Sequence, residues 1–163
     1  MIWPMSQWRY KSPQRNRRIA CPPQTPAKKA PANAPAVMKL SAFTILIPDY
    51  DAAIAFFCDG LGFSLTEDIP QGPKRWVTVT PPGENIRLVL ARADTPAQRA
   101  ALHNPAGGRV WLFLQSDDFA ADAAKITTAG GTFEETPRQE PYGTVAVWRD
   151  PFGNRWDLIQ AAL

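Results

Sequence analysis

The sequence predicts an α+β fold made of two copies of one βαβββ unit, and an internal repeat is the first observation that predicts it. Residues 148–159 read WRDPFGNRWDLI, and residues 79–90, which lie 69 positions earlier, read VTPPGENIRLVL. In both stretches an apolar strand enters a turn and a second apolar strand follows. A proline and an asparagine of the turn keep the same spacing in the two copies: Pro82 and Pro151, Asn85 and Asn154. Repetition at this length indicates two copies of one supersecondary unit, because a solenoid needs three or more shorter repeats.

The order of the residue patterns in each half is the second observation. The first unit begins with an apolar, β-branched strand over residues 42–47, and Asp49 then caps a helix. The apolar stripe of this helix has helical spacing and consists of Ala53, Ile54, Phe57, Cys58 and Leu61. Gly60 and Gly62 end the helix. Three further strands are predicted at about residues 63–67, 75–80 and 86–91.

The second unit repeats this order after a polar connector, residues 92–108, in which residues 96–102 form a short helix. A strand is predicted over residues 109–115. A helix capped by Asp117 and Asp118 follows, carries Phe119, Ala123 and Ile126, and ends at Gly130 and Gly131. The last three strands are expected at about residues 132–135, 143–148 and 155–160. Between the last two, the turn over residues 150–154 contains the proline, glycine and asparagine that tight turns favour.

Composition separates a leader, residues 1–38, from a folded domain, residues 39–161. The leader is rich in proline and holds seven Lys or Arg residues and no acid. We expect it to be disordered, because such a segment buries too little apolar surface to offset the entropy of ordering. The domain consists of unit 1 (about 39–91), the connector, and unit 2 (about 109–161).

Charge and hydropathy exclude several classes of function. The chain carries a net charge of +3, but residues 39–163 hold eleven bases against fifteen acids. The folded part is therefore acidic, and we expect no nucleic-acid partner. No apolar run approaches the ~18 residues that a membrane span needs, and no secretory signal is visible. We expect a cytoplasmic protein with no membrane partner.

Three motifs resemble those of the vicinal oxygen chelate superfamily, which includes glyoxalases, bleomycin-binding proteins, fosfomycin-resistance transferases and extradiol dioxygenases. They are IPDYDAAIAFF at residues 47–57, Leu61-Gly62-Phe63, and Asp150-Pro151-x-Gly153-Asn154 followed by Asp157. The resemblance covers residues 39–161. It implies that the two repeats form a curved mixed sheet around a concave cavity and that the protein is a homodimer. It does not identify a reaction, because this fold hosts many chemistries.

The resemblance also implies where a metal would be bound. In the enzymes of the superfamily, the ligands of a divalent metal come from the first and last strands of each unit. The corresponding places here are Ala42, Leu88, Trp111 and Asp157. Only Asp157 could bind a metal, and hard divalent cations need several ligands. We therefore expect no metal cofactor, unless ligands other than Ala42, Leu88 and Trp111 join Asp157. His103, the one histidine, is expected to be an exposed residue of the connector.

The concave face is then expected to form a small-molecule site. If Ala42 and Trp111 face the cavity, strand alternation adds Thr44, Phe113 and Gln115. Asp157 is either a site residue or the partner of Arg155, Arg87 or another base. The loop at residues 137–143 borders the pocket in the superfamily, so that Arg138 could bind an anionic group and Tyr142 could donate a hydrogen bond; the alternative is a solvated loop. The predicted ligand-binding residues are Ala42, Thr44, Leu88, Trp111, Phe113, Gln115, Arg138, Tyr142 and Asp157.

These expectations favour a small-molecule binding protein that works without a metal, in ligand sequestration or resistance. The alternative is a metal-dependent, glyoxalase-like lyase or dioxygenase. Whether the protein is an enzyme stays open, because no Ser/His/Asp or Cys/His arrangement is assembled and no catalytic residue is predicted. The sequence does not identify the ligand.

Overall fold

The structure is a computed structural model that describes residues 38–162. These residues belong to one compact unit, Met38–Leu163. The prediction of disorder for the leader falls on residues 1–37, which lie outside the described part. Within residues 38–162, no helix is long and apolar enough to cross a membrane.

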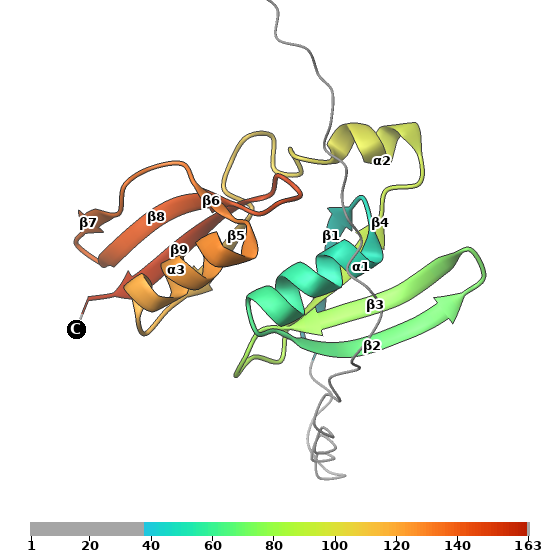
Figure 1. Cartoon of the computed structure of the whole chain (residues 1–163), viewed down its shortest axis with the longest axis horizontal. Coiled ribbons are helices and arrows are strands. Elements are labelled where there is room, and N and C mark those ends of the chain that lie inside the picture. The colour runs from blue at the N-terminus through green and yellow to red at the C-terminus, as the bar shows by residue number, and fades with distance from the viewer. Residues whose placement is uncertain (1–37, 163) are drawn as a thin grey trace, which may run out of the picture. The chain divides into compact units, whose positions relative to one another are not determined.

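The predicted α+β fold with two βαβββ repeats is confirmed (Figure 1). The first repeat consists of β1 (Ala42–Ile47), α1 (Tyr50–Ile54), the π-helical segment η1 (Ala55–Gly60), β2 (Ser64–Gln71), β3 (Lys74–Thr80) and β4 (Arg87–Arg92). The short helix α2 (Pro96–Ala101) lies in the connector. The second repeat consists of β5 (Leu112–Gln115), α3 (Phe119–Ala129), β6 (Thr132–Phe133), β7 (Arg138–Glu140), β8 (Gly143–Arg149) and β9 (Arg155–Ala161).

Three features of the second repeat differ from the sequence prediction. Strand β6 ends at Phe133 and not at residue 135. Strand β5 begins at Leu112 and not at residue 109. The segment expected to be a loop before β8 contains strand β7, in which Arg138 pairs with Val145 and Glu140 pairs with Gly143. Local propensity does not predict β7, because Arg, Gln and Glu become a strand here by pairing with a neighbour.

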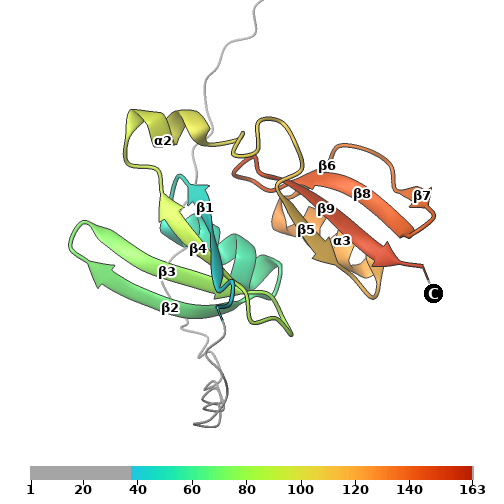
Figure 2. The ribbon, with the colours of Figure 1, turned by 180° about the vertical axis from the view of Figure 1, so that it is seen from behind.

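The strands form two mixed sheets (Figure 2). The first has the order β1-β4-β3-β2 and the second the order β5-β9-β8-β6, with β7 also paired to β8. Within each sheet the first strand pairs in parallel with the last one, β1 with β4 and β5 with β9, and the other pairs are antiparallel. Strands β1 and β5 are therefore edge strands.

The helices cover one face of each sheet, here called the inner face, and the opposite face is called the outer face. The inner faces of both sheets contribute to one hydrophobic core together with α1, η1 and α3. Side chains of η1 contact the second sheet: Phe56 lies 6.4 Å from Trp148, and Phe57 lies 6.2 Å from Trp156, between ring centroids. The core thus joins the two repeats.

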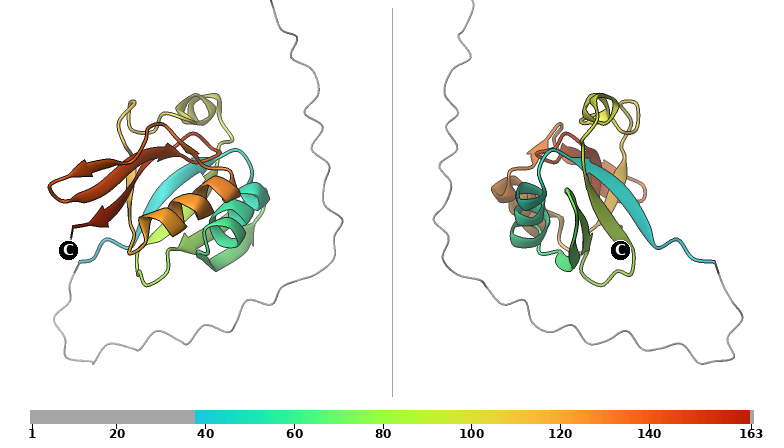
Figure 3. Two further views of the ribbon diagram at one scale, coloured as in Figure 1. Left: turned by 60° about the vertical axis from the view of Figure 1, so that its left-hand side comes forward. Right: turned by 90° about the vertical axis from the view of Figure 1, so that its right-hand side faces the viewer.

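Local signals fix the ends of the helices as predicted. The Asp49 carboxylate accepts a hydrogen bond from the backbone of Ala52, and Asp118 does so from Ala121, at 2.9 and 3.0 Å. Figure 3 shows α1 and α3 side by side, and η1 packs against α3. A Cβ atom at Gly60 would lie 2.6 Å from the Cβ of Ala129, so this contact requires a glycine.

The turn between β8 and β9 is organised by a buried carboxylate. Asp150 is 4% exposed. It accepts hydrogen bonds from the backbone of Phe152 and Asn154, from the Asn154 amide and from Trp156 Nε1, at 2.8 to 3.1 Å. Burial raises the pKa of Asp150, and the four donors offset part of that rise. The turn thereby places Phe152 in the core.

We predict that Asp150→Asn lowers the free energy of unfolding by about 2 to 4 kcal/mol, because an amide can accept from one pair of these donors and must face the other pair with its NH₂ group. Urea denaturation measures the change. The matched control is Asp59→Asn, whose side chain is exposed on η1, and which should change stability by less than about 0.5 kcal/mol. Equal effects of the two substitutions would contradict this account of the turn.

Candidate functional site

The outer face of the second sheet carries four of the nine predicted ligand-binding residues. Phe113 pairs with Asp157, and Val147 pairs with Asp157 from the other side. Leu112 and Leu114 contact the core, so that alternation turns Trp111, Phe113 and Gln115 to the outer face. Phe113 is 62% exposed, which is unusual for a phenylalanine. Trp111, Phe113, Gln115 and Asp157 therefore lie together on one face.

Two predicted residues lie on the other sheet. Ala42 and Thr44 are on the outer face of β1, because Phe43, Ile45 and Ile47 of that strand contact the core. Thr44 is exposed and Ala42 is half-buried. No hydrogen-bonded ladder in the described part of the chain joins the two sheets.

Leu88 is not on the expected face. It pairs with Phe43, is 4% exposed and lies in the core. The outer-face residues of β4 are instead Arg87 and Val89. The cause is a turn of different length: Ala42 pairs with Arg87, 45 positions later, whereas the Trp111 backbone bonds to Arg155, 44 positions later. A slip of one residue exchanges the two faces of a strand.

One carboxylate oxygen of Asp157 accepts no hydrogen bond from the described residues. This atom, Oδ1, is buried and has no hydrogen-bond partner among the described residues; the same is true of Trp111 Nε1 on this face and of Trp148 Nε1 in the core. Burial raises the pKa of Asp157, nearby Glu135 adds to the rise, and the positive charges of Arg138 and Arg155 oppose it. A buried acceptor without a donor costs about 1–3 kcal/mol, so this group is not explained by stability.

The two ion pairs that could have satisfied Asp157 are not formed. Arg155 donates to Glu134, with 2.6 Å between Nη2 and Oε2, and to the backbone oxygen of Gly108. Arg87 donates to Glu67 on the first sheet at 2.9 Å. The interpretation of Asp157 as a member of a structural pair with either arginine is therefore excluded.

Arg138 and Tyr142 lie in and beside the β7–β8 hairpin. The guanidinium of Arg138 donates to Glu140, with 3.0 Å between Nε and Oε1, and through Nη1 to Glu135. It lies close enough to Asp157 to lower its pKa but does not bond to it. Two carboxylates already hold this guanidinium, which weakens the expected contact with an anion. Tyr142 is 55% exposed, at the turn of the hairpin.

Sequence reasoning missed a polar cluster on the outer face of the first sheet. One oxygen of Glu67 accepts hydrogen bonds from Trp76 Nε1 at 2.9 Å, from the Thr78 hydroxyl at 3.2 Å and from Arg87 Nη1 at 2.9 Å. Trp76 and Thr78 could have been placed by alternation. The position of Glu67 could not, because a β-bulge between Leu65 and Glu67 shifts its register.

A cavity of about 650 Å³ lies between the two repeats. Its apolar lining comes from both repeats and includes Phe43, Leu61, Phe63, Leu112, Leu114 and Leu158. Edge strands β1 and β5 both border it, and Asp157 does not. Three predicted ligand-binding residues also line the cavity, Leu88, Phe113 and Gln115, so that it adjoins the predicted ligand-binding face at β5.

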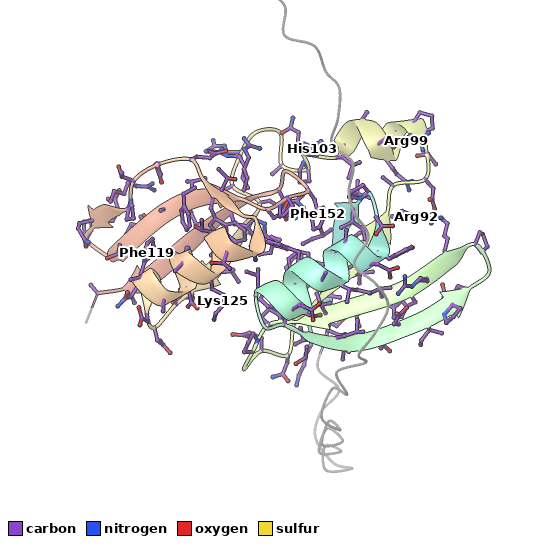
Figure 4. All side chains as sticks on the ribbon, viewed as in Figure 1. Arg92, Arg99, His103, Phe119, Lys125 and Phe152 are labelled. Carbon is purple, nitrogen blue, oxygen red and sulfur yellow. The ribbon has the colours of Figure 1, made fainter. Side chains whose placement is uncertain are left out.

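The described residues contain no group of three or more His, Cys, Asp or Glu side chains that could hold a metal ion. His103 is exposed in the connector (Figure 4). Its ring lies against the turn of β8 and β9, where a Cβ atom at Gly153 would be 2.2 Å from His103 Nδ1. This close contact gives His103 a packing role.

Comparison with known proteins identifies the family. Residues 39–158 match the model of the glyoxalase/bleomycin resistance protein/dioxygenase superfamily. The chain belongs to this superfamily. A protein of Shewanella frigidimarina is 48% identical over 119 residues, which are 71% of this chain and 88% of that protein.

Two solved structures are also similar to this member of the superfamily. The crystal structure of UcmS2 has a TM-score of 0.66 and 32% identity, and covers 76% of this chain and 98% of its own. TnmS3, an antibiotic binding protein from Streptomyces sp. CB03234, has a TM-score of 0.63 and 31% identity, and covers 78% of this chain and 98% of its own. The resemblance inferred from the three sequence motifs is thereby confirmed.

We predict that Asp157→Asn leaves the melting temperature at pH 7 unchanged or raises it by a few degrees. A carboxyl pKa that is higher in the folded protein than in the unfolded chain means that ionisation destabilises the fold. The variant should therefore become more stable than the unsubstituted protein as the pH rises through the pKa that Asp157 has in the folded state. Below the pKa that Asp157 has in the unfolded chain, this difference should vanish. Thermal unfolding between pH 3 and pH 8 measures it, and a clear loss of stability at pH 7 would show that Asp157 has a structural partner.

Proposed function

We propose that this protein binds a small molecule on the outer face of its second sheet, and that it does so without a metal. The binding face is formed by Trp111, Phe113, Gln115 and Asp157, with Arg138 beside it. The exposed Phe113 and the half-buried Trp111 supply apolar contact, and a few polar groups supply orientation, as in most small-molecule sites.

The observation that carries the proposal is the unsatisfied oxygen of Asp157. It lies beside Val147, which is buried, and Phe113, which is exposed. A carboxylate oxygen without a hydrogen-bond partner is consistent with a binding group, because functional sites retain polar groups that the fold alone does not satisfy.

The comparisons support binding rather than a particular reaction. TnmS3, at 31% identity over most of this chain, is described as an antibiotic binding protein. A role in sequestration of, or resistance to, a toxic small molecule would be consistent with that similarity.

We propose independence from metal because of the side chains at the positions where the superfamily's enzymes bind their metal. After correction of the register, the outer-face places on the first and last strands are Ala42, Val89, Trp111 and Asp157. Three of these four side chains have no group that binds a hard cation. Among these four residues, Asp157 alone has a side-chain oxygen that could bind a metal ion.

We further propose that two copies of the chain associate along strands β1 and β5. Both are edge strands whose outward backbone groups are available for pairing. The apolar cavity that they border would be covered by a second copy. A dimer would also add a wall to the outer face around Asp157, which is open in a single chain.

We expect a screen of full-length protein against apolar aromatic compounds to give ligands with micromolar dissociation constants. Phe113→Ala and Asp157→Asn should each weaken binding by about tenfold, which corresponds to 1.4 kcal/mol. Thermal shift identifies the ligands and calorimetry measures their affinities. Asp59→Asn, on the exposed side of η1, is the matched control and should bind as the unsubstituted protein does.

Elemental analysis and light scattering on the same preparation test the other two parts of the proposal. Purification without chelators, followed by exposure to nickel, manganese, iron and zinc, should leave far less than one metal per chain. Light scattering should give twice the mass of one chain. Retention of one metal per chain, lost in Asp157→Ala, would contradict the metal-free proposal and favour a metal-dependent lyase or dioxygenase.

A further inference from the structure

The charged groups around Asp157 are almost completely paired with one another. Arg138 is held by Glu135 and Glu140, and Arg155 by Glu134. Arg149 also pairs with Glu134 and donates to the Gly153 backbone oxygen at 3.0 Å. Three arginines thus form ion pairs with three glutamates, and these pairs neutralise the positive charge near the outer face.

Asp157 is the charged group left over from this pairing. It adds one negative charge to a neutralised set, and its buried oxygen accepts no hydrogen bond from the described residues. Asp157 therefore lacks a donor, and the other unpartnered buried group on this face is a neutral one, the indole Nε1 of Trp111. An arriving anion would find no uncommitted arginine and would be repelled by Asp157 in a partly desolvated place.

The remaining surroundings of Asp157 are apolar. Val145 and Val147 on β8 are buried outside the main core, and Ile159 on β9 is half-buried beside them. Val145 pairs with Ile159 and Val147 pairs with Asp157, so that these side chains share the outer face. Phe113 extends this surface across β5.

We propose that the ligand of this face carries a hydrogen-bond donor, a hydroxyl or a protonated amine, on an apolar aromatic body, and that the site rejects anions. The proposal rests on the proposed binding function and names the chemical class that the site selects. The donor bonds to Asp157, and the aromatic body lies against the exposed Phe113 and the half-buried Ile159. Because Arg138 is paired with Glu135 and Glu140, this proposal differs from the prediction from sequence that Arg138 binds an anionic group.

Four matched probes test this selectivity with the full-length protein. They are 1-naphthylmethanol, 1-naphthylmethylamine, 1-naphthoate and 1-methylnaphthalene, which share one aromatic body and differ in the polar group. Ligand-observed NMR titrations at pH 7 give their relative affinities. We expect the alcohol and the amine to bind at least about tenfold more tightly than the carboxylate and the hydrocarbon.

The two donor probes also separate charge from hydrogen bonding. A stronger preference for the amine that falls with added salt would show that the ionised carboxylate pairs with a cation. Equal affinities for the amine and the alcohol would show that the hydrogen bond dominates. Either result supports a ligand that brings a donor.

Substitutions connect the preference to the named residues. Asp157→Ala should remove the difference between the alcohol and the hydrocarbon, while Asp59→Asn should keep it. Glu140→Gln removes one of the two carboxylates that hold Arg138, and should therefore improve binding of the carboxylate probe and reduce the advantage of the amine.

Two outcomes would overturn the inference in distinguishable ways. If the carboxylate binds as tightly as the alcohol and the amine, and Asp157→Ala does not alter the order, the face binds ligands but does not select donors. If none of the four probes binds and the wider screen yields no ligand, the proposed binding function itself fails, and the selectivity fails with it.

Discussion

The fold depends on the contact that η1 of the first repeat makes with the second sheet. Trp148 and Trp156 stack with their ring centroids 5.3 Å apart, and Phe56 and Phe57 pack against them from η1. Aromatic groups of this size dominate the energetics of a core. Because the inner faces of both sheets are used to join the repeats, the outer faces remain available to other molecules.

This division explains where polar groups are found. On the inner side, the buried polar group Asp150 is satisfied by four donors and organises a turn. On the outer side, Arg138 and Arg155 form ion pairs with glutamates, and Asp157 Oδ1 receives no hydrogen bond from the described residues. The satisfied carboxylate of Asp150 has a structural role, whereas the fold provides no partner for the buried Oδ1 of Asp157.

The sequence predicted what local signals determine. Strand β1 was placed at its observed bounds, and the caps Asp49 and Asp118 and the end of α3 at Gly130 were correct, because capping and turn chemistry act within a few residues. The family was also recognised from short motifs. Leu88 was misplaced because a repeat spacing of 69 does not reveal that one turn is a residue longer.

The sequence could not predict which charges pair. Arg138 binds Glu135 and Glu140, and Glu67 binds Arg87 across 20 positions, through contacts that depend on strand register and on a bulge. Strand β7 likewise exists only through its pairing with β8. Tertiary geometry decides such interactions, and in this protein it is those interactions that leave Asp157 unpaired.

The pKa of the Asp157 carboxyl group tests this account most directly. Carbon-13 NMR titration of full-length protein, with the resonance assigned by its loss in Asp157→Asn, measures it without and with a bound ligand. The account predicts a value above that of an ordinary aspartate in the free protein, and a fall when a donor-bearing ligand binds. An ordinary or lowered value in the free protein would show that Asp157 already has a partner, and would contradict its role as the binding group.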